Sequence, residues 1–378
     1  MGKHLLVTND FPPKVGGIQN YLYELWSRLD PSSFVVVTTS HPEAKQFDLE
    51  QRFKIVRLHR RVLLPTRSLA KDIQDLAIVN KAEFIIWDPA LPVGLLAPTM
   101  GIPYAVVLHG AELTIPAHLP IASMRLRKVL GGAEFVVVAG QYPKSEIDHL
   151  FSKKMANGPD ILEVPPGVDG SRFRVLAQEE RKRFREQLGI SETDFLLCSV
   201  SRLVPRKGID TLVEAAGLLR NTYPSLKVLI AGTGRDQNRL AALIERRKAP
   251  VRLLGRISEE ELPTLLGSSD SFAMLCRSRW AGLEQEGFGI VFLEASSCGI
   301  PVIAGYSGGS CEAVVNQETG FVIYKPKSAR RTAEAISMLI EDEELRRNMG
   351  TKGRVRATDL FSYDILSVRL QNYLDKVV

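Results

Sequence analysis

The chain alternates short runs of apolar, often β-branched residues with amphipathic stretches of helical length. Apolar strands separated by helices are typical of parallel sheets that are covered by helices on both faces. In the first half we expect strands at 4–8, 34–39, 54–58, 84–87, 104–108, 135–139 and 161–164, and helices at 19–29, 69–80 and 144–151.

The pattern restarts after the segment Pro165-Pro166-Gly167, which continues neither a helix nor a strand, and the charged segment 178–187, so we place the hinge there. A chain of 378 residues is long enough for two such domains. We therefore predict an α/β fold with two Rossmann-like, doubly wound parallel-sheet domains facing each other across a cleft. In the second half we expect strands at 195–201, 227–231, 252–254, 271–275 and 302–304, and helices at 208–223, 235–247, 259–267, 288–298 and 329–340. A last helix, at 361–377, either caps the second domain or crosses back onto the first.

Apolar residues make up 45% of the chain and charged residues 24%, as in a globular protein with full-sized cores. No apolar stretch is long enough for a spanning helix, and the first apolar run is too short for a signal peptide. The four cysteines have neither metal-site nor disulfide spacing, which favours a reducing, cytoplasmic location. The net charge of +6 favours anionic partners such as nucleotides, phospholipid headgroups or nucleic acid.

The segment 277–295, which joins an expected strand to a helix, is the most informative one. Glycines at the helix start let backbone amides approach a ligand closely, and the positive end of the helix dipole suits a diphosphate. The helix start consists of Gly287, Phe288, Gly289 and Ile290. Glu286 precedes the helix and Glu294 lies inside it, off the same helical stripe, so they suit two tasks: contact with a reacting sugar and with ribose hydroxyls. The alternative is that Glu286 and Glu294 are ordinary solvated carboxylates without a role in binding.

The segment 200–210 carries the cations. Arg202 follows a strand, and Lys207 and Gly208 open the next helix. Two cations there are able to stabilise a diphosphate leaving group, as Mg²⁺ does elsewhere. The chain has no Asp-x-Asp pair, so we expect no metal site. The alternative is a loop with solvated Arg206 and Lys207.

Three weaker signals also follow expected strands. The loop 9–19 contains Gly16-Gly17 without the P-loop lysine, His109 precedes a glycine, and Gly308-Gly309 offer backbone donors. Each is alternatively a simple turn. Because all these loops lie at carboxyl ends of strands, we expect them to form one site.

These motifs, NDFPPKVGGIQ, SRLVPRKGID, EGFGIVFLEA and AGYSGGSCEAV, resemble those of retaining glycosyltransferases of family 4, which have the GT-B fold. Within that family the chain is similar to the actinobacterial GDP-mannose-dependent phosphatidylinositol mannosyltransferases. One departure is Cys311, where related enzymes often have proline before the glutamate of the GGxxE loop.

The resemblance implies a role for each matching position. Arg202 and Lys207 would hold the diphosphate, Glu286 the transferred sugar and Glu294 the ribose, and His109 would line the sugar site. The backbone would contribute the remaining donor contacts, at Gly16, Gly17, Gly255, Arg256, Gly287, Phe288, Gly289 and Ile290.

The resemblance also implies the reaction. Mannose would pass from GDP-mannose to a phosphatidylinositol mannoside, as the second mannose in an alpha-1,6 linkage, with retention, without a metal and without a covalent nucleophile. The last helix would cross back, so that residues 1–167 with 362–378 form the acceptor-binding domain and 168–361 the nucleotide-sugar-binding domain.

A lipid acceptor requires contact with a membrane. The segment 52–71 has seven Lys or Arg residues, no acidic residue and interleaved Phe53, Val62, Leu63 and Leu64. It favours reversible attachment to an anionic surface, at the inner face of the plasma membrane. The alternative is a solvated loop whose apolar residues belong to the core.

Several other functions stay open at this point. An NAD-dependent oxidoreductase would need a third glycine in 231–235 and a suitable acid, and a nucleic-acid-binding protein would need aromatic platforms and a denser basic stripe. The local motifs do not distinguish a GDP-mannose-dependent transferase from a nucleotide-sugar epimerase, or from a family 4 transferase that uses a UDP- or ADP-sugar.

Overall fold

The computed structural model describes residues 3–110, 113, 116, 119–151 and 158–377. The chain divides into two compact units, Met1–Pro166 with Tyr363–Val378, and Gly167–Ser362. Residues 1, 2 and 378, which belong to the expected first domain, lie outside the described residues.

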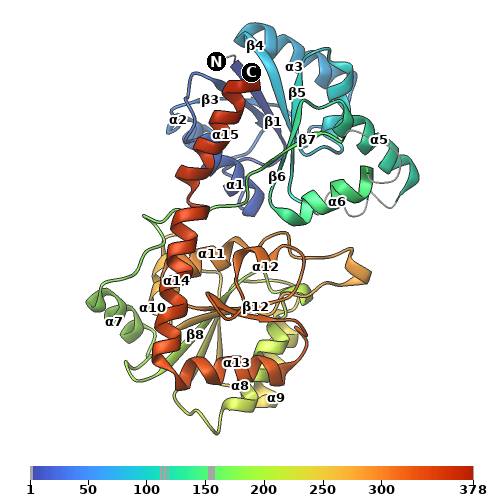
Figure 1. Ribbon diagram of the computed structural model, residues 1–378. Coiled ribbons are helices and arrows are strands. Elements are labelled where there is room, and N and C mark those ends of the chain that lie inside the picture. Colours follow the sequence, from blue (N-terminus) through green and yellow to red (C-terminus); the bar gives the residue numbers. More distant parts are fainter. Residues whose placement is uncertain (1–2, 111–112, 114–115, 117–118, 152–157, 378) are drawn as a thin grey trace. The chain divides into compact units, whose positions relative to one another are not determined.

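The first unit is built around a parallel seven-stranded sheet of order β3-β2-β1-β4-β5-β6-β7 (Figure 1). Its strands are β1 (Lys3–Thr8), β2 (Phe34–Thr39), β3 (Lys54–Leu58), β4 (Ala82–Asp88), β5 (Tyr104–Leu108), β6 (Phe135–Val138) and β7 (Asp160–Glu163). Its helices are α1 (Gly17–Trp26), α2 (Ala44–Leu49), α3 (Arg67–Asn80), η1 (Val93–Thr99), α5 (Pro120–Gly131), α6 (Gln141–Phe151) and α15 (Tyr363–Val377).

Helices cover both faces of this sheet. Apolar side chains of α3, η1, α5 and α6 form the core on one face, and those of α1 and α15 form the core on the other. Strand β2 is entirely buried, because a sheet covered on both faces has no polar side. The last helix, α15, packs on α1 through buried Tyr363, Leu366, Leu370 and Leu374.

The second unit has a parallel six-stranded sheet of order β10-β9-β8-β11-β12-β13. Its strands are β8 (Phe195–Val200), β9 (Leu226–Ala231), β10 (Val251–Gly255), β11 (Ser271–Met274), β12 (Val302–Gly305) and β13 (Gly320–Ile323). Its helices are α7 (Gln178–Gln187), η2 (Pro205–Lys207), α8 (Ile209–Leu219), α9 (Gln237–Arg247), α10 (Glu261–Ser268), η3 (Trp280–Gly282), α11 (Ile290–Ser297), α12 (Ser310–Ala313), α13 (Ala329–Glu341) and α14 (Glu343–Phe361).

This sheet is covered in the same way, by α8, α9 and α13 on one face and by α7, α10, α11 and the end of α14 on the other. Strand order therefore confirms the doubly wound α/β prediction for both units. The charged segment 178–187, expected between the halves, is helix α7 of the second unit, and strand β13 was not expected. This helix packs on the second unit because the buried guanidinium of Arg185 binds Asp270 and backbone carbonyls there.

No helix among the described residues is both long and apolar enough to cross a membrane. The four cysteines are free thiols, and Cys198, Cys276 and Cys298 are buried.

Candidate active site

In the second unit the strand order reverses between β8 and β11, and the loops that follow these two strands carry most of the expected site residues. Such a reversal is where doubly wound sheets bind ligands, because the loops on its two sides diverge. The loop after β12 lies beside them: Gly309 N–H donates to the Glu286 carbonyl at 3.0 Å.

The central contact is a three-residue cluster of Arg206, Lys207 and Glu286. One oxygen, Oε2 of Glu286, accepts from Nη1 of Arg206 and from Nζ of Lys207, each at 2.7 Å. The side chain of Glu286 is 9% exposed, against 16% for Arg206 and 11% for Lys207. The cluster thus holds one net positive charge in a mostly buried position.

Glycine places Lys207 in this cluster. The short helix η2 ends at Gly208, which has a left-handed backbone with φ of 67° and begins α8. A Cβ at Gly208 would lie 1.8 Å from the carbonyl oxygen of Leu275, so no other residue fits without moving the end of β11. The backbone therefore fixes the approach of the β8 loop to the β11 loop.

The backbone of Glu286 is held from the β12 loop. Its N–H donates to Ser307 Oγ at 3.2 Å, and Ser307 Oγ also lies 3.2 Å from Ser278 Oγ. Burial raises the pKa of Glu286, but the charges and hydrogen bonds of Lys207 and Arg206 outweigh burial and hold the pKa below its usual value. Glu286 is therefore a carboxylate at neutral pH.

The helix start that follows is built as the sequence predicts. Gly289 begins α11 with a left-handed backbone, φ 84°, and a Cβ there would lie 2.6 Å from the Phe292 ring. Phe288 is buried against Phe361, at 5.7 Å between ring centroids, so only its backbone is available to a ligand. Gly287 and Ile290 are half-buried.

Glu294, inside α11, is half-buried, and burial raises its pKa to about 7, with Arg172 opposing this shift and Glu259 adding to it. A carboxyl group with this pKa is able to donate or accept a hydrogen bond near neutral pH. This property suits contact with hydroxyl groups such as those of ribose.

Three of the expected donor contacts lie outside the three-residue cluster, at the ends of β8 and β10. Arg202 follows β8, and its side chain is exposed, with no ion pair in the part of the chain that the structure describes. Gly255 ends β10 with φ of 73°, its carbonyl accepts from Gly232 N–H, and Arg256 after it is exposed. The structure does not bring Arg202 into the cluster that contains Lys207.

In the first unit, the expected site residue His109 ends up bonded to a residue that the sequence did not single out. Nε2 of His109 lies 2.7 Å from Oδ1 of Asp88, and Thr8 donates to the other Asp88 oxygen at 2.6 Å. The His109 ring also meets Tyr21 edge-on, at 5.4 Å. His109 follows β5, whereas Asp88 and Thr8 end β4 and β1, the two strands that flank the strand-order reversal of this sheet.

The Gly16-Gly17 loop follows β1, the strand that ends at Thr8. Gly16 caps α1, and a Cβ there would lie 2.3 Å from Oε1 of Gln19, while both glycines are exposed. Gln19 donates to Asp10, whose pKa is raised by burial and by the Asp88 charge. Backbone amides at the start of α1 are thus open to an anion.

The basic segment 52–71 divides between core and surface. Phe53 and Leu63 are buried, so the expectation that they interleave with the surface cations is wrong. Phe53 packs in the core on the α1 and α15 face of the sheet, and Leu63 packs in the core on the other face. Val62 and Leu64 are each 52% exposed. Arg61, Arg67 and Lys71 are exposed as well, whereas Arg60 is paired with Asp72 at 2.6 Å.

Two site residues were missed from the sequence, Arg206 and Asp88. Arg206 was treated as part of a solvated alternative, and its signal was its place beside Lys207 in a proline-bounded turn. Asp88 ends the strand run FIIWD, and a carboxylate at a strand end was the signal. Within the described ranges no three His, Cys, Asp or Glu residues are grouped to hold a metal ion, and independence from metal stays a prediction.

The loops and sheets described above have counterparts in known proteins. Residues 180–356 match the family model for glycosyl transferases group 1. The fold is similar to that of the Anabaena protein Alr3699/HepE in complex with UDP and glucose, with a TM-score of 0.80, 21% identity and coverage of 99% of this chain and 100% of that one.

Several curated relatives, including the following two, match over almost the full length. The chain is 34% identical to a GDP-mannose-dependent monoacylated alpha-(1-6)-phosphatidylinositol monomannoside mannosyltransferase of Corynebacterium glutamicum, over 98% of this chain and 97% of the relative. It is 36% identical to a GDP-mannose-dependent alpha-(1-6)-phosphatidylinositol monomannoside mannosyltransferase of Mycobacterium tuberculosis, over 99% and 98%. The chain therefore belongs to the group 1 glycosyltransferases, family 4, and has their GT-B fold.

Proposed function

We propose that this glycosyltransferase moves mannose from GDP-mannose to a phosphatidylinositol mannoside, adding the second mannose in an alpha-1,6 linkage for cell-envelope glycolipids. The full-length similarity to the two mannosyltransferases supports this donor and this acceptor. The proposal includes retention of the anomeric configuration and independence from a metal ion. It assigns acceptor binding to the unit that contains β1 to β7, and most of the donor contacts to the unit that contains β8 to β13.

The observation that carries the proposal is the convergence of Arg206 and Lys207 on Glu286 at the strand-order reversal of the second sheet. The two cations are already ordered by a carboxylate, so stabilising a departing diphosphate requires no new arrangement of charges. Two glycine-started helices, α8 and α11, begin beside this cluster and offer further N–H donors.

In the proposed reaction the bond between the anomeric carbon and the donor phosphate oxygen breaks. A bond forms between the same carbon and the acceptor hydroxyl oxygen, on the same face of the sugar. The hydroxyl proton passes to the departing phosphate oxygen, so the products are GDP and the mannosylated lipid. Lys207, with Arg206 beside it in the cluster, and Arg202 stabilise the charge on the leaving group, and Glu286 contacts the sugar.

His109 contacts the transferred sugar in this proposal. Its hydrogen bond to Asp88 fixes the ring orientation, and Thr8 fixes Asp88 in turn. Glu294 binds the ribose hydroxyls, and the backbone of Gly16 and Gly17 binds donor phosphate.

We also propose peripheral attachment to the cytoplasmic face of the plasma membrane. The exposed residues Arg61, Val62, Leu64, Arg67 and Lys71 combine cations with apolar side chains, which is the combination that anionic bilayers bind. Each cation near such a surface contributes about 1 kcal/mol.

A donor panel tests the proposal directly. The purified chain is incubated with a phosphatidylinositol monomannoside acceptor and GDP-mannose, UDP-glucose, UDP-N-acetylglucosamine or ADP-glucose in turn, and lipid products are separated and their linkages determined. We expect product from GDP-mannose alone, and the same rate in EDTA as in magnesium. Transfer from another donor, or a rate that EDTA abolishes and magnesium restores, would contradict the proposal.

A further inference from the structure

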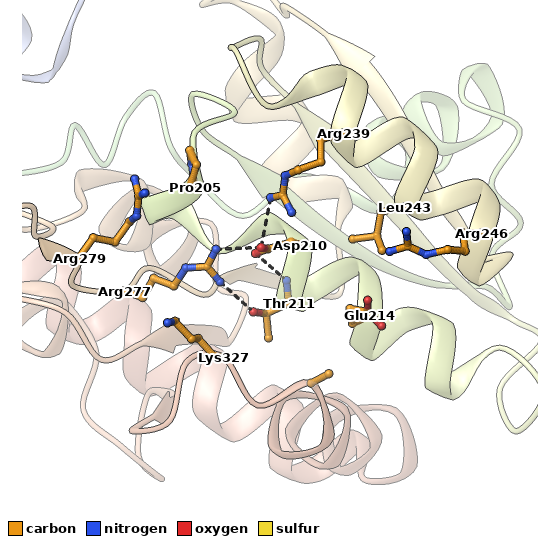
Figure 2. A pocket seen from close by; sticks show the side chains of 11 residues that line it. Pro205, Asp210, Thr211, Glu214, Arg239, Leu243, Arg246, Arg277, Arg279 and Lys327 are labelled. Carbon is orange, nitrogen blue, oxygen red and sulfur yellow. Dashed lines mark hydrogen bonds and ion pairs between the residues drawn. The ribbon is translucent and has the colours of Figure 1, made fainter.

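A pocket of about 510 Å³ lies on the α8 and α9 side of the second sheet (Figure 2). Its walls come from α8, α9, the loop after β11 and the segment that enters α13. This volume is in the range of small-molecule sites. Neither Arg206, Lys207 nor Glu286 lines it, so it is distinct from the cluster described above.

The charges that line this pocket are predominantly positive. Five cations line it against two carboxylates, Asp210 and Glu214. The five cations are Arg239, Arg246, Arg277, Arg279 and Lys327. A surface that is enriched in one sign of charge raises the local concentration of ligands of the opposite sign.

Three of these cations are held in place by carboxylates. Arg239 binds both oxygens of Asp236 at 2.6 Å, and Arg279 pairs with Glu284 at 2.9 Å. One oxygen of Asp210 accepts from Arg277 at 2.8 Å and from Arg239 at 3.2 Å, as Figure 2 shows. A guanidinium has five N–H donors, so these arginines are ordered and still have donors to offer.

The other two cations have no such partner. Arg246, on α9, and Lys327, before α13, are exposed and make no ion pair within the ranges that the structure describes. Glu214 is engaged by Arg247 at 2.5 Å, so it does not neutralise either of them. The two cations come from different elements and line one pocket, which favours a ligand that bridges them.

We propose that this pocket binds a small phosphate monoester between Arg246, Lys327 and the ordered Arg239. With the paired residues Asp236, Glu284 and Arg247 included, two positive charges remain in excess. A phosphate monoester carries about −1.5 to −2 at pH 7, which matches this excess, whereas a carboxylate supplies only one charge. Leu243 and Ala329 offer an apolar wall to the organic part of the ligand.

The protein has a built-in reporter beside the pocket. The guanidinium of Arg279 lies 4.8 Å from the ring centroid of Trp280, which is 63% exposed. The other two tryptophans, Trp26 and Trp87, are fully buried in the first unit. Because Arg279 lines the same pocket, a ligand bound between Arg246, Lys327 and Arg239 is expected to change the fluorescence of Trp280 through Arg279.

The experiment is a fluorescence titration of the full chain with glycerol 1-phosphate, with and without saturating GDP. The pocket variant is Arg246→Gln with Lys327→Gln, which removes two exposed charges and leaves the core unchanged. The matched control is Arg347→Gln with Lys352→Gln, two exposed cations of α14 that do not line the pocket. A second arm replaces the soluble probe with phosphatidic acid vesicles, since a lipid headgroup presents the same phosphate monoester.

Saturable binding that GDP does not displace, and that the pocket variant weakens about tenfold while the control variant does not, supports the proposal. The same pattern with the vesicles alone supports it and identifies a lipid headgroup as the source. Absence of binding to both probes, displacement by GDP, or equal weakening in both variants overturns it. Calorimetry of Trp280→Phe, which loses the fluorescence signal, is expected to give the same affinity as the wild type.

Discussion

Lys207 Nζ and Glu286 Oε2 lie 2.7 Å apart, in a contact that links the loop after β8 to the loop after β11. Arg206 binds the same oxygen at the same distance. One carboxylate therefore orders two cations before any ligand is present. Lys207 and Arg206 therefore contribute to the stability of the two loops as well as to their charge, whereas the exposed Arg202 contributes charge alone.

The first prediction concerns Glu286. Glu286→Gln leaves Lys207 mostly buried without a counter-charge and leaves Arg206 only its longer pair with Glu284, at 3.9 Å, so we expect the free energy of unfolding to fall by about 3 kcal/mol. The folded pKa of Glu286 is depressed below its ordinary value of 4.5. Its stabilising contribution is therefore fully present above pH 4.5 and is lost as the pH falls through the folded pKa. Urea unfolding of both proteins at pH 7 and below pH 4.5 measures it; a difference independent of pH would contradict the ion pair.

The second prediction separates Arg202 from Lys207. If both stabilise the leaving group, Arg202→Ala and Lys207→Ala each lower kcat by about 10²-fold to 10³-fold. Only Lys207→Ala is expected to lower the free energy of unfolding as well, because Arg202 is exposed whereas Lys207 is paired with Glu286. Steady-state kinetics and urea unfolding measure the two effects. Arg235→Ala, which removes another exposed arginine of the second unit, is the control, and near-normal turnover in both variants would remove the assigned roles.

The third prediction concerns Asp88, which holds the His109 ring. Asp88→Asn keeps the size of the side chain but loses the charge-assisted hydrogen bond, and we expect kcat to fall about tenfold with a smaller change in KM. Glu83→Gln changes an exposed carboxylate of the same strand and is expected to leave kcat unchanged. Equal rates for Asp88→Asn and Glu83→Gln would show that the orientation of His109 has no part in turnover.

The fourth prediction follows from the raised pKa of Glu294, about 7 in the folded chain against an ordinary 4.5. The unfolded chain loses this proton first, so Glu294 costs stability as the pH rises from 4.5 to 7, by at most about 3 kcal/mol. Glu294→Gln is therefore expected to gain stability relative to the wild type between pH 5 and pH 8. Thermal unfolding across this range measures the difference, and parallel pH curves for the two proteins would contradict the shift.

The fifth prediction concerns attachment to membranes. Arg61→Glu with Arg67→Glu reverses two exposed charges and is expected to weaken binding to anionic liposomes by more than about tenfold. Arg60 is a poorer choice, because its reversal also breaks the pair with Asp72. Arg347→Glu with Lys352→Glu gives the same change in net charge elsewhere and serves as the control in a liposome flotation assay. Equal loss in both variants would point to net charge alone, and GDP affinity is expected to stay unchanged in each.

The sequence was sufficient for the fold class. Runs such as Phe34–Thr39 are buried along their whole length, and a parallel sheet with helices on both faces is the structure that buries such a strand. The sequence also indicated a helix start at Gly208 and at Gly289. Both glycines have a left-handed backbone there, which glycine adopts without steric cost. These features are local, since they depend on the period of the apolar residues and on the absence of a side chain.

Only the tertiary structure decided which charged residue meets which. Glu286 lies about 80 positions from Arg206 and Lys207, and no local spacing connects them. Asp88 and His109 come from neighbouring strands, 21 residues apart in the chain. The same holds for the core positions of Phe53 and Leu63 in a segment that reads as a basic surface. Sequence periodicity determines the elements, whereas ion pairs between loops depend on strand order and register, which arise when the sheet assembles.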